Sequence, residues 1–150
     1  MKKLLCYLIL LCLLLSCKQR RRTAFDLKPS VIAQIDSSNY TEILWKDSVQ
    51  SFGTVNEGDS VKLTYTFENT GNRPLFLSTV RPGCGCTVAE FTEDAVLPGH
   101  TGFVKAIFNT HGHPGSIFKS ISVTSNTKNK TMHILIFKGQ VIRKEQYENK

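Results

Sequence analysis

Residues 60–75 read SVKLTYTFENTGNRPL, and this stretch determines the fold class. Apolar side chains occupy the odd positions from 61 to 67, and polar side chains occupy the even positions between them. This period of two predicts a strand with one buried face and one wet face. The Asn-Thr-Gly-Asn that follows predicts a turn, because Gly and Asn tolerate a positive φ, and Pro74 opens the next segment. The stretch therefore predicts two consecutive strands of one sandwich.

Short segments bounded by Gly, Pro, Asn and Asp continue to residue 142, and no helical spacing interrupts them. This pattern predicts an all-β domain, an immunoglobulin-like antiparallel β-sandwich of about seven strands. The segments 102–109 and 132–137 carry apolar residues at both odd and even positions. We therefore expect them to be central strands that are covered on both faces. Within 116–124, Lys119 interrupts the apolar parity, which predicts either a bulge or a lysine that extends to an edge. The expected strands are 51–55, 60–68, 75–81, 86–92, 101–110, 116–124 and 131–141.

The first sixteen residues read as a secretory signal. Lys2 and Lys3 precede an apolar run over residues 4–15, which is too short to span a bilayer as a helix, since a span needs about 20 residues. The run ends in Leu-Leu-Ser-Cys at positions 14–17, which resembles the lipobox of bacterial lipoproteins. The resemblance implies that Cys17 is acylated before cleavage. We therefore expect residues 1–16 to be removed and the chain to be held on a membrane by lipid at Cys17.

The net charge of +7 is concentrated near this lipid site. Lys18, the three arginines 20–22 and Lys28 follow Cys17, whereas residues 45–142 hold nine Lys plus Arg against seven Asp plus Glu, a difference of two. A nearly neutral domain excludes nucleic acid as a partner. The basic cluster predicts either a contact with an anionic membrane surface or a solvated spacer.

The resulting organisation has four parts. A signal peptide at 1–16 precedes a lipidated N-terminus and basic, flexible tether at 17–44. The immunoglobulin-like domain covers 45–142, and a charged tail follows at 143–150. Residues 31–35 of the tether favour a short helix or an added strand.

Two of the five cysteines remain for chemistry once the signal and Cys17 are set aside. Cys84 and Cys86 flank Gly85 in a turn between two predicted strands. A disulfide across two residues closes a very small ring and is comparatively reducible. A soft-metal site would need more ligands, and the His-x-His of His111 and His113 would complete a tetrahedron with both thiolates. The third interpretation is a tight corner whose small side chains pack on the core. The sequence leaves these three open.

Signals for catalysis are absent from the sequence. It has no G-x-S-x-G, H-E-x-x-H, P-loop or G-x-G-x-x-G motif, and its paired acidic residues fall at turns. His100 and His133 read as structural residues of a turn and a strand. We therefore expect no enzyme, no catalytic residue and no cofactor.

Several segments together resemble the bacterial domain of unknown function 1573, which is related to the immunoglobulin-like modules named after ASPM, SPD-2 and Hydin. The matching pieces are Phe-Gly-Thr-Val at 52–55, Glu-Gly at 57–58, Phe-Glu-Asn-Thr-Gly-Asn at 67–72, Pro-Leu at 74–75, Cys-Gly-Cys-Thr at 84–87, Pro-Gly at 98–99, Gly115, Phe-Lys at 118–119, Ser-Asn at 125–126 and Lys-Gly at 138–139. The resemblance implies an immunoglobulin-like fold in exported proteins and no catalytic activity. Such exported proteins are often lipoproteins of the Bacteroidota type, in which surface-exported lipoproteins tend to carry acidic residues after the lipid cysteine. The basic residues here instead favour an outer-membrane protein that faces the periplasm.

The first hypothesis for function is a non-enzymatic binding or scaffolding module for a protein of the cell envelope. The second is a thiol redox or soft-metal protein that uses Cys84 and Cys86, with His111 and His113 as further ligands. A hydrolase with an unrecognised site is the third.

Overall fold

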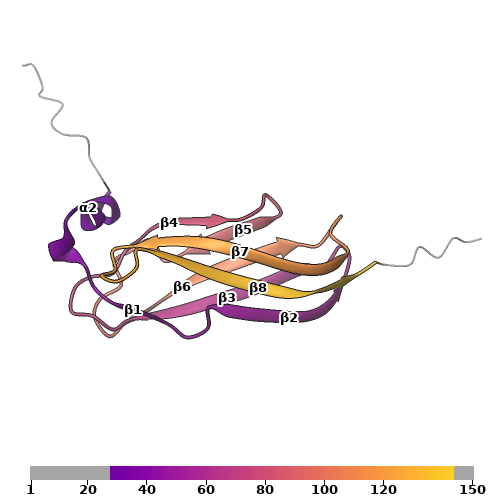
Figure 1. Ribbon diagram of the computed structural model, residues 1–150, viewed down its shortest axis with the longest axis horizontal. Helices are drawn as coiled ribbons and strands as arrows, with labels where there is room; N and C mark the ends of the chain where they lie inside the picture. Colours follow the sequence, from indigo (N-terminus) through magenta and orange to yellow (C-terminus); the bar gives the residue numbers. More distant parts are fainter. Residues whose placement is uncertain (1–27, 144–150) are drawn as a thin grey trace, which may run out of the picture.

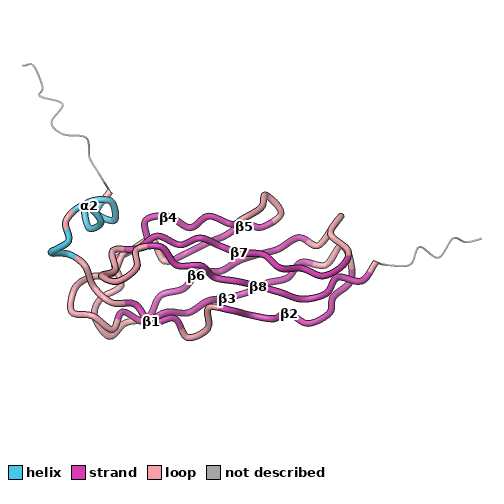
Figure 2. The backbone as a smooth tube through the Cα atoms, viewed as in Figure 1, coloured by secondary structure: helices cyan, strands magenta, loops and turns pink. Residues whose placement is uncertain are grey.

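The structure, a computed structural model, describes residues 28–143. They form two packed four-stranded sheets with one short helix at one end (Figure 1). Loops gather at the two ends of the sandwich (Figure 2). The elements are α2 Pro29–Ile35, the 3-10 helix η1 Ser37–Asn39, β1 Ile43–Trp45, β2 Val49–Asn56, β3 Ser60–Asn69, β4 Leu77–Pro82, β5 Thr87–Phe91, β6 Thr101–Asn109, β7 Gly115–Ser125 and β8 Met132–Ile142.

The strand order is β1-β3-β6-β5 in one sheet and β2-β8-β7-β4 in the other. This confirms the all-β sandwich but corrects two details. The number of strands is eight rather than about seven, because the short β1 precedes the first predicted strand: β1 pairs with β3, and β2 pairs with β8. The second pairing is parallel, so the predicted purely antiparallel arrangement is wrong there. A three-residue β1 is too short for its side-chain period to be read from sequence.

Strand boundaries also move. Residue 75, the predicted start of the third strand, forms only an isolated bridge with Val96, and β4 begins at Leu77. The register between β7 and β8 runs from Gly115 to Thr124 without a shift, and Lys119 faces Phe137 within it. The pairing of β4 with β7 stops at Pro82 and Ile121, so Lys119 lies beyond the end of β4. Of the two alternatives for Lys119, the structure has the lysine at an open edge and no bulge.

The strands β6 and β8 are central in their sheets, as predicted, but they are covered on one face only. Ile107 is 38% exposed, Ile134 is 40% exposed and Met132 is 54% exposed. These three side chains lie on the outer faces of the two sheets, opposite the core residues of the same strands. In these two strands, apolar residues at both odd and even positions therefore correspond to one buried face and one exposed apolar face, and not to two covered faces.

The core lies between the two sheets and is rich in aromatic rings. Phe67, Phe108 and Phe137 are fully buried, and burying each such side chain contributes about 1.5–3 kcal/mol. Tyr65 is also buried, and its hydroxyl donates to the carbonyl of Ile136 in the opposite sheet at 2.8 Å. Burial raises the pKa of Tyr65 to about 12. No disulfide joins the sheets among the described residues, so packing and hydrogen bonds such as this one hold them together.

The stretch predicted as a tether is partly folded where the structure describes it. Residues 29–35 form α2 rather than a strand, with Pro29 in its first turn and Ala33 buried. The Gln34 amide donates to the Ser78 hydroxyl of β4, and the Asn126 amide donates to the Asn39 carbonyl at 2.7 Å. These bonds fasten α2 and η1 to the end of the sandwich. No helix in residues 28–143 is long and apolar enough to cross a membrane.

Candidate functional site

The two ends of the sandwich carry different chemistry. The end beside α2 holds the β7–β8 turn, and the opposite end holds the β4–β5 and β6–β7 connections (Figure 1). Histidine and hydroxyl groups gather at the first end, and the Cys-Gly-Cys corner lies at the second. The free edge of β5 runs between the two.

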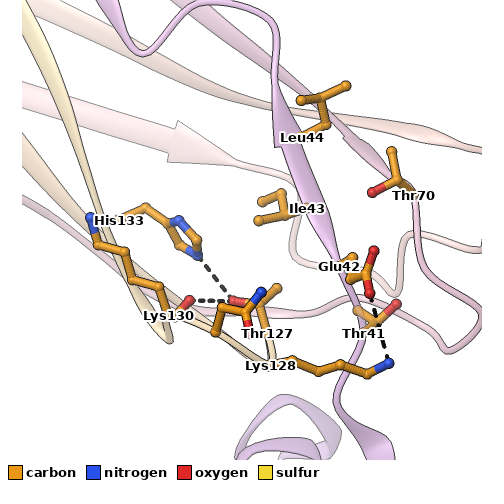
Figure 3. A pocket seen from close by; sticks show the side chains of 10 residues that line it. Thr41, Glu42, Ile43, Leu44, Thr70, Thr127, Lys128, Lys130 and His133 are labelled. Atoms are coloured by element: carbon orange, nitrogen blue, oxygen red, sulfur yellow. Dashed lines mark hydrogen bonds and ion pairs between the residues drawn. The ribbon is translucent and has the colours of Figure 1, made fainter.

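A pocket of about 300 Å³ opens at the α2 end, between β1 and the β7–β8 turn (Figure 3). Its charged groups are mixed: Lys128 lies 3.8 Å from Glu42, and both side chains are more than half exposed. An exposed pair of this kind contributes about 0–1 kcal/mol. The lining residues are Thr41, Glu42, Ile43, Leu44, Thr70, Thr127, Lys128, Asn129, Lys130 and His133.

The His133 ring closes one wall of this pocket and lies on two hydroxyl groups. Its Nε2 atom is 2.9 Å from the Ser125 Oγ atom and 3.1 Å from the Thr127 Oγ1 atom, and the Thr127 hydroxyl donates to the Lys130 carbonyl at 2.5 Å. Partial burial, together with the charge of Lys130, lowers the pKa of His133. Ser125 is fully buried, and no third described group binds the other ring nitrogen, so this is not a nucleophile with its base. The cluster fastens the β7–β8 turn, in agreement with the structural role expected for His133.

Trp45 lies behind the same wall. Its ring centroid is 5.1 Å from that of Phe67 and 6.0 Å from that of His133. Its indole nitrogen is buried and has no hydrogen-bond partner among the described residues. The ring therefore contributes apolar packing.

At the opposite end, Cys84 and Cys86 form a disulfide with an S–S distance of 2.09 Å. Of the three interpretations left open by the sequence, the structure contains the bonded pair. The Thr87 Oγ1 atom lies 3.5 Å from the Cys84 Sγ atom, and Thr87 itself is buried. Both cysteines are partly exposed, and Cys86 packs against the core.

His111 and His113 lie in the β6–β7 connection at this same end. The His113 ring packs on Phe108 with 5.8 Å between centroids, and the His111 amide donates to the Asn109 side chain at 3.0 Å. Within residues 28–143, no group of three or more His, Cys, Asp or Glu side chains is placed to hold a metal ion. The structure thus does not assemble the two histidines and two cysteines into one metal site.

The free edge of β5 is the third feature. The Asn109 amide donates to the Cys86 carbonyl at 3.0 Å, and the Thr92 amide donates to the Phe103 carbonyl at 3.1 Å. Antiparallel pairs alternate between bonded and non-bonded positions, so the even-numbered residues of β5 bond to β6. The amide and carbonyl groups of Ala89 and Phe91 therefore point away from β6. In the part of the chain that the structure describes, no strand pairs with β5 on that side.

The other three edge strands are protected in ways that β5 is not. β1 has only three residues, and β2 has a register shift around Gly53, whose φ is 72°. β4 has a register shift near Leu77, ends in Pro82 and contacts α2. Shifts, prolines and short length are the usual means of blocking an edge. β5 is regular over all five residues and contains no proline.

A shallow cavity of about 310 Å³ lies on the outer sheet face beside β5. Val88 and Ile107, which face each other across β5 and β6, form its apolar floor and are 65% and 38% exposed. Lys62, Lys105 and Glu90 surround them. Neither lysine forms an ion pair with another described residue, since the pair of Glu42 with Lys128 is the one that the structure shows between residues 28 and 143.

Sequence reasoning predicted a strand at this position but not that its edge is free. Edge status depends on which strands neighbour each other, and the order of strands in a sheet is not written in the local pattern. The remaining predicted features, Cys17, the signal peptide at 1–16, the basic cluster at 18–22 and the tail from residue 144, lie outside the described residues.

Comparison with known proteins places this fold among relatives. The model of the family DUF1573, described as a protein of unknown function, matches residues 43–141. A protein of unknown function from Porphyromonas gingivalis W83 has a TM-score of 0.60 at 16% identity, over 70% of this chain and 49% of that one. The chain therefore spans about half the length of that protein.

A second solved structure is similar over nearly its whole length. An ASH / PapD-like domain of human CEP192 (PapD-like domain 7) has a TM-score of 0.54 at 16% identity, over 82% of this chain and 97% of that domain. At such identity the likeness shows the fold alone, and it confirms the predicted immunoglobulin-like relation. No curated protein matches the sequence.

Proposed function

This chain belongs to the DUF1573 family, and we propose that it is a non-enzymatic protein-binding module of the bacterial cell envelope. The observation that carries the proposal is the unprotected edge of β5, where the backbone groups of Ala89 and Phe91 point away from the sheet. An extended segment of a partner protein pairs with such an edge as an added strand. The backbone hydrogen bonds supply affinity, and the side chains of the added strand supply specificity.

The cavity beside β5 defines the chemistry of the partner. A strand added to β5 places alternate side chains on the same sheet face as Val88 and Glu90, since residues two apart share a face. Val88 and Ile107 favour an apolar side chain at one of these positions. Lys62 and Lys105 outnumber Glu90, so they favour an acidic residue nearby. The partner segment is therefore extended, with an apolar and an acidic residue on one face.

Anchoring is the second part of the proposal. The lipobox-like sequence ending at Cys17 supports removal of residues 1–16 and acylation of that cysteine. The basic residues that follow support an outer-membrane lipoprotein facing the periplasm. Ten residues, 18–27, lie between Cys17 and the first described residue, Lys28, so a fully extended chain would span about 40 Å between these two. That length lets the domain search for partners close to the membrane.

Photo-crosslinking in intact cells tests the binding site. A benzoylphenylalanine replaces Val88 beside the β5 edge in one full-length variant, and it replaces Phe118 in a matched control. Phe118 is 69% exposed, like Val88, but it lies on the other sheet. We expect a discrete adduct from position 88 that the further substitution Ala89→Pro abolishes. Proline removes the outward amide of Ala89 and leaves the bonds to β6, and edge strands tolerate it.

Two outcomes would contradict the site. One is an adduct from position 88 that persists at full yield in the Ala89→Pro variant. The other is an adduct that forms only from position 118. Circular dichroism of the Ala89→Pro chain shows whether the sandwich is intact, and a second variant, Lys62→Glu, should reduce the adduct without altering the edge.

A further inference from the structure

Beyond protein binding, we propose that the Cys84–Cys86 disulfide is a redox-active pair that oxidises an exposed dithiol on another polypeptide. The site is the corner Pro82–Thr87 between β4 and β5, at the end of the sandwich opposite α2. The proposal rests on the chemistry of this corner and does not depend on binding at the β5 edge. Four observations support it: position in the chain, access, bracing and a nearby hydroxyl group.

The disulfide contributes little to the stability of the folded domain. It joins residues only two apart, so it removes little conformational freedom from the unfolded chain, because such stabilisation grows with the length of the closed loop. Both cysteines belong to the same connection between β4 and β5, so the disulfide does not link the two sheets to each other. A bond with little structural value that links two partly exposed sulfurs belongs to the reducible class of disulfides.

The tip of the corner is open to an attacking thiol. A side chain added at Gly85, between the cysteines, would meet no atom within 4 Å. The space beside Gly85 is therefore open, and the partial exposure of both cysteines leaves the corner accessible to a thiol from solvent. Thiol exchange requires the attacking sulfur to approach along the S–S bond, so this exposure is a requirement that a buried disulfide does not meet.

Both ends of the corner are braced independently of the disulfide. The Gly83 amide donates to the Ser120 carbonyl of β7 at 2.8 Å, and the Cys86 carbonyl accepts from Asn109 of β6 at 3.0 Å. Each brace joins the corner to a different sheet. Opening the S–S bond therefore leaves the two sulfurs near each other, and the pair can close again.

The two sulfurs are not equivalent. The Thr87 hydroxyl lies 3.5 Å from Cys84 Sγ, within donating distance of a thiolate there. A donated hydrogen bond favours the charged form of a thiol. Cys86 instead packs against the core. Cys84 is thus the sulfur that forms the mixed disulfide and the better leaving group when that mixed disulfide is broken, and Cys86 is the resolving cysteine.

The reaction is a two-step exchange in which electrons and protons balance. A substrate thiolate attacks Cys84 Sγ, the bond to Cys86 breaks, and Cys86 leaves as a thiolate that takes up a proton. The second substrate thiolate then attacks the substrate sulfur, and Cys84 leaves as a thiolate. The substrate dithiol loses two electrons and two protons and becomes a disulfide. The protein disulfide gains the two electrons and two protons and becomes two thiols.

The test uses the purified full-length chain, with dithiothreitol and a reduced two-cysteine peptide as the dithiols. Oxidation is followed by absorbance and intact mass. We expect one dithiol oxidised per chain, at a rate at least about tenfold above that of oxidised glutathione at equal concentration. Cys84→Ser/Cys86→Ser should abolish it, and Cys6→Ala/Cys12→Ala/Cys17→Ala, which removes the other three cysteines, should not. Cys86→Ser should trap a mixed disulfide with the oxidised peptide, and Cys84→Ser should not.

Substitutions of Thr87 test its proposed hydrogen bond to Cys84 through the pH dependence of Cys84 alkylation, which a purely structural role of Thr87 would not change. In the Cys86→Ser background, Thr87→Val should raise the pH at which alkylation of Cys84 reaches half its maximal rate, and Thr87→Ser should restore it. An oxidation rate no greater than that of the double serine variant would overturn the proposal. So would two free thiols with bound metal in the protein as purified, which would indicate a metal site instead.

Discussion

Gly102 shows how a single residue fixes the spacing of the core. It pairs in register with Phe67, and the fully buried Phe67 ring lies where a side chain at position 102 would be. The Phe52 ring likewise lies where a side chain at Gly139 would be. At both positions glycine is needed because it has no side chain, and not because the backbone has a positive φ. Aromatic rings therefore fill volume that side chains of the facing residues would otherwise occupy.

Gly102→Ala should destabilise the domain by about 1–3 kcal/mol, because an extra methyl group forces Phe67 out of a well-packed position. The free energy of unfolding in denaturant, measured on the full-length chain, checks this. Gly85→Ala is the matched control, since nothing lies within 4 Å of the added atom, and we expect a change within about 0.5 kcal/mol. Equal losses for the two variants would contradict the packing argument.

His133 makes stability depend on pH. Its pKa is lowered by burial and by Lys130, so at mildly acidic pH the unfolded chain binds a proton that the folded chain does not. The contribution is fully present above the usual histidine value of 6.5 and is lost as the pH falls below it toward the lowered folded pKa. Thermal midpoints at pH 7.5 and 5.0 should differ, with the lower midpoint at pH 5.0. His133→Gln should reduce this difference. An unchanged difference in that variant would assign it to other groups.

At the scale of elements, the edges of the sheets decide what the domain offers to partners. Three edges are shortened, shifted or ended by proline, and β5 alone among the described edge strands keeps a regular free side. The same strand begins directly after the disulfide corner. Two sites of different chemistry therefore lie next to each other, and each has its own test.

The elements also show where prediction from sequence succeeds. The alternation around Tyr65 identified β3 almost to the residue, because one face of a strand must be apolar when it covers a core. β1 and the parallel pairing of β2 were missed, since three residues carry no period and pairing direction depends on distant strands. Apolar residues on both parities predicted two covered faces, but Ile107 and Ile134 are exposed. For the candidate sites, sequence singled out Cys84 and Cys86, but strand order was needed to find the β5 edge.

At the scale of the whole molecule, the two ends of the sandwich have separate roles. The described chain enters at α2, so the lipid at Cys17 would hold that end toward the membrane (Figure 1). The β4–β5 connection, which holds the Cys84–Cys86 corner, lies toward the opposite end from α2 (Figure 1). The β5 edge runs along the side between them. If Cys17 carries the lipid, both proposed sites would therefore lie away from the anchored end.

Cys17→Ala tests the anchor. If Cys17 carries the lipid, the variant chain should keep its signal residues or leave the membrane fraction, because the thiol is the site of acylation. Cell fractionation and intact mass of the full-length product check this, with Cys12→Ala as the control that should stay membrane-bound and processed. A Cys17→Ala chain with unchanged membrane retention and mass shift would contradict lipid attachment at this residue.

Hydrogen–deuterium exchange of the full-length chain in native envelope membranes tests the central claim most directly. The comparison is with the same chain purified in detergent, away from its partner. An added strand on β5 predicts that amides of residues 87–91 exchange more slowly in the membranes, that those of β4 do not change, and that Ala89→Pro abolishes the difference. If residues 87–91 exchange equally fast in both preparations while another surface becomes protected, the binding site is not the β5 edge.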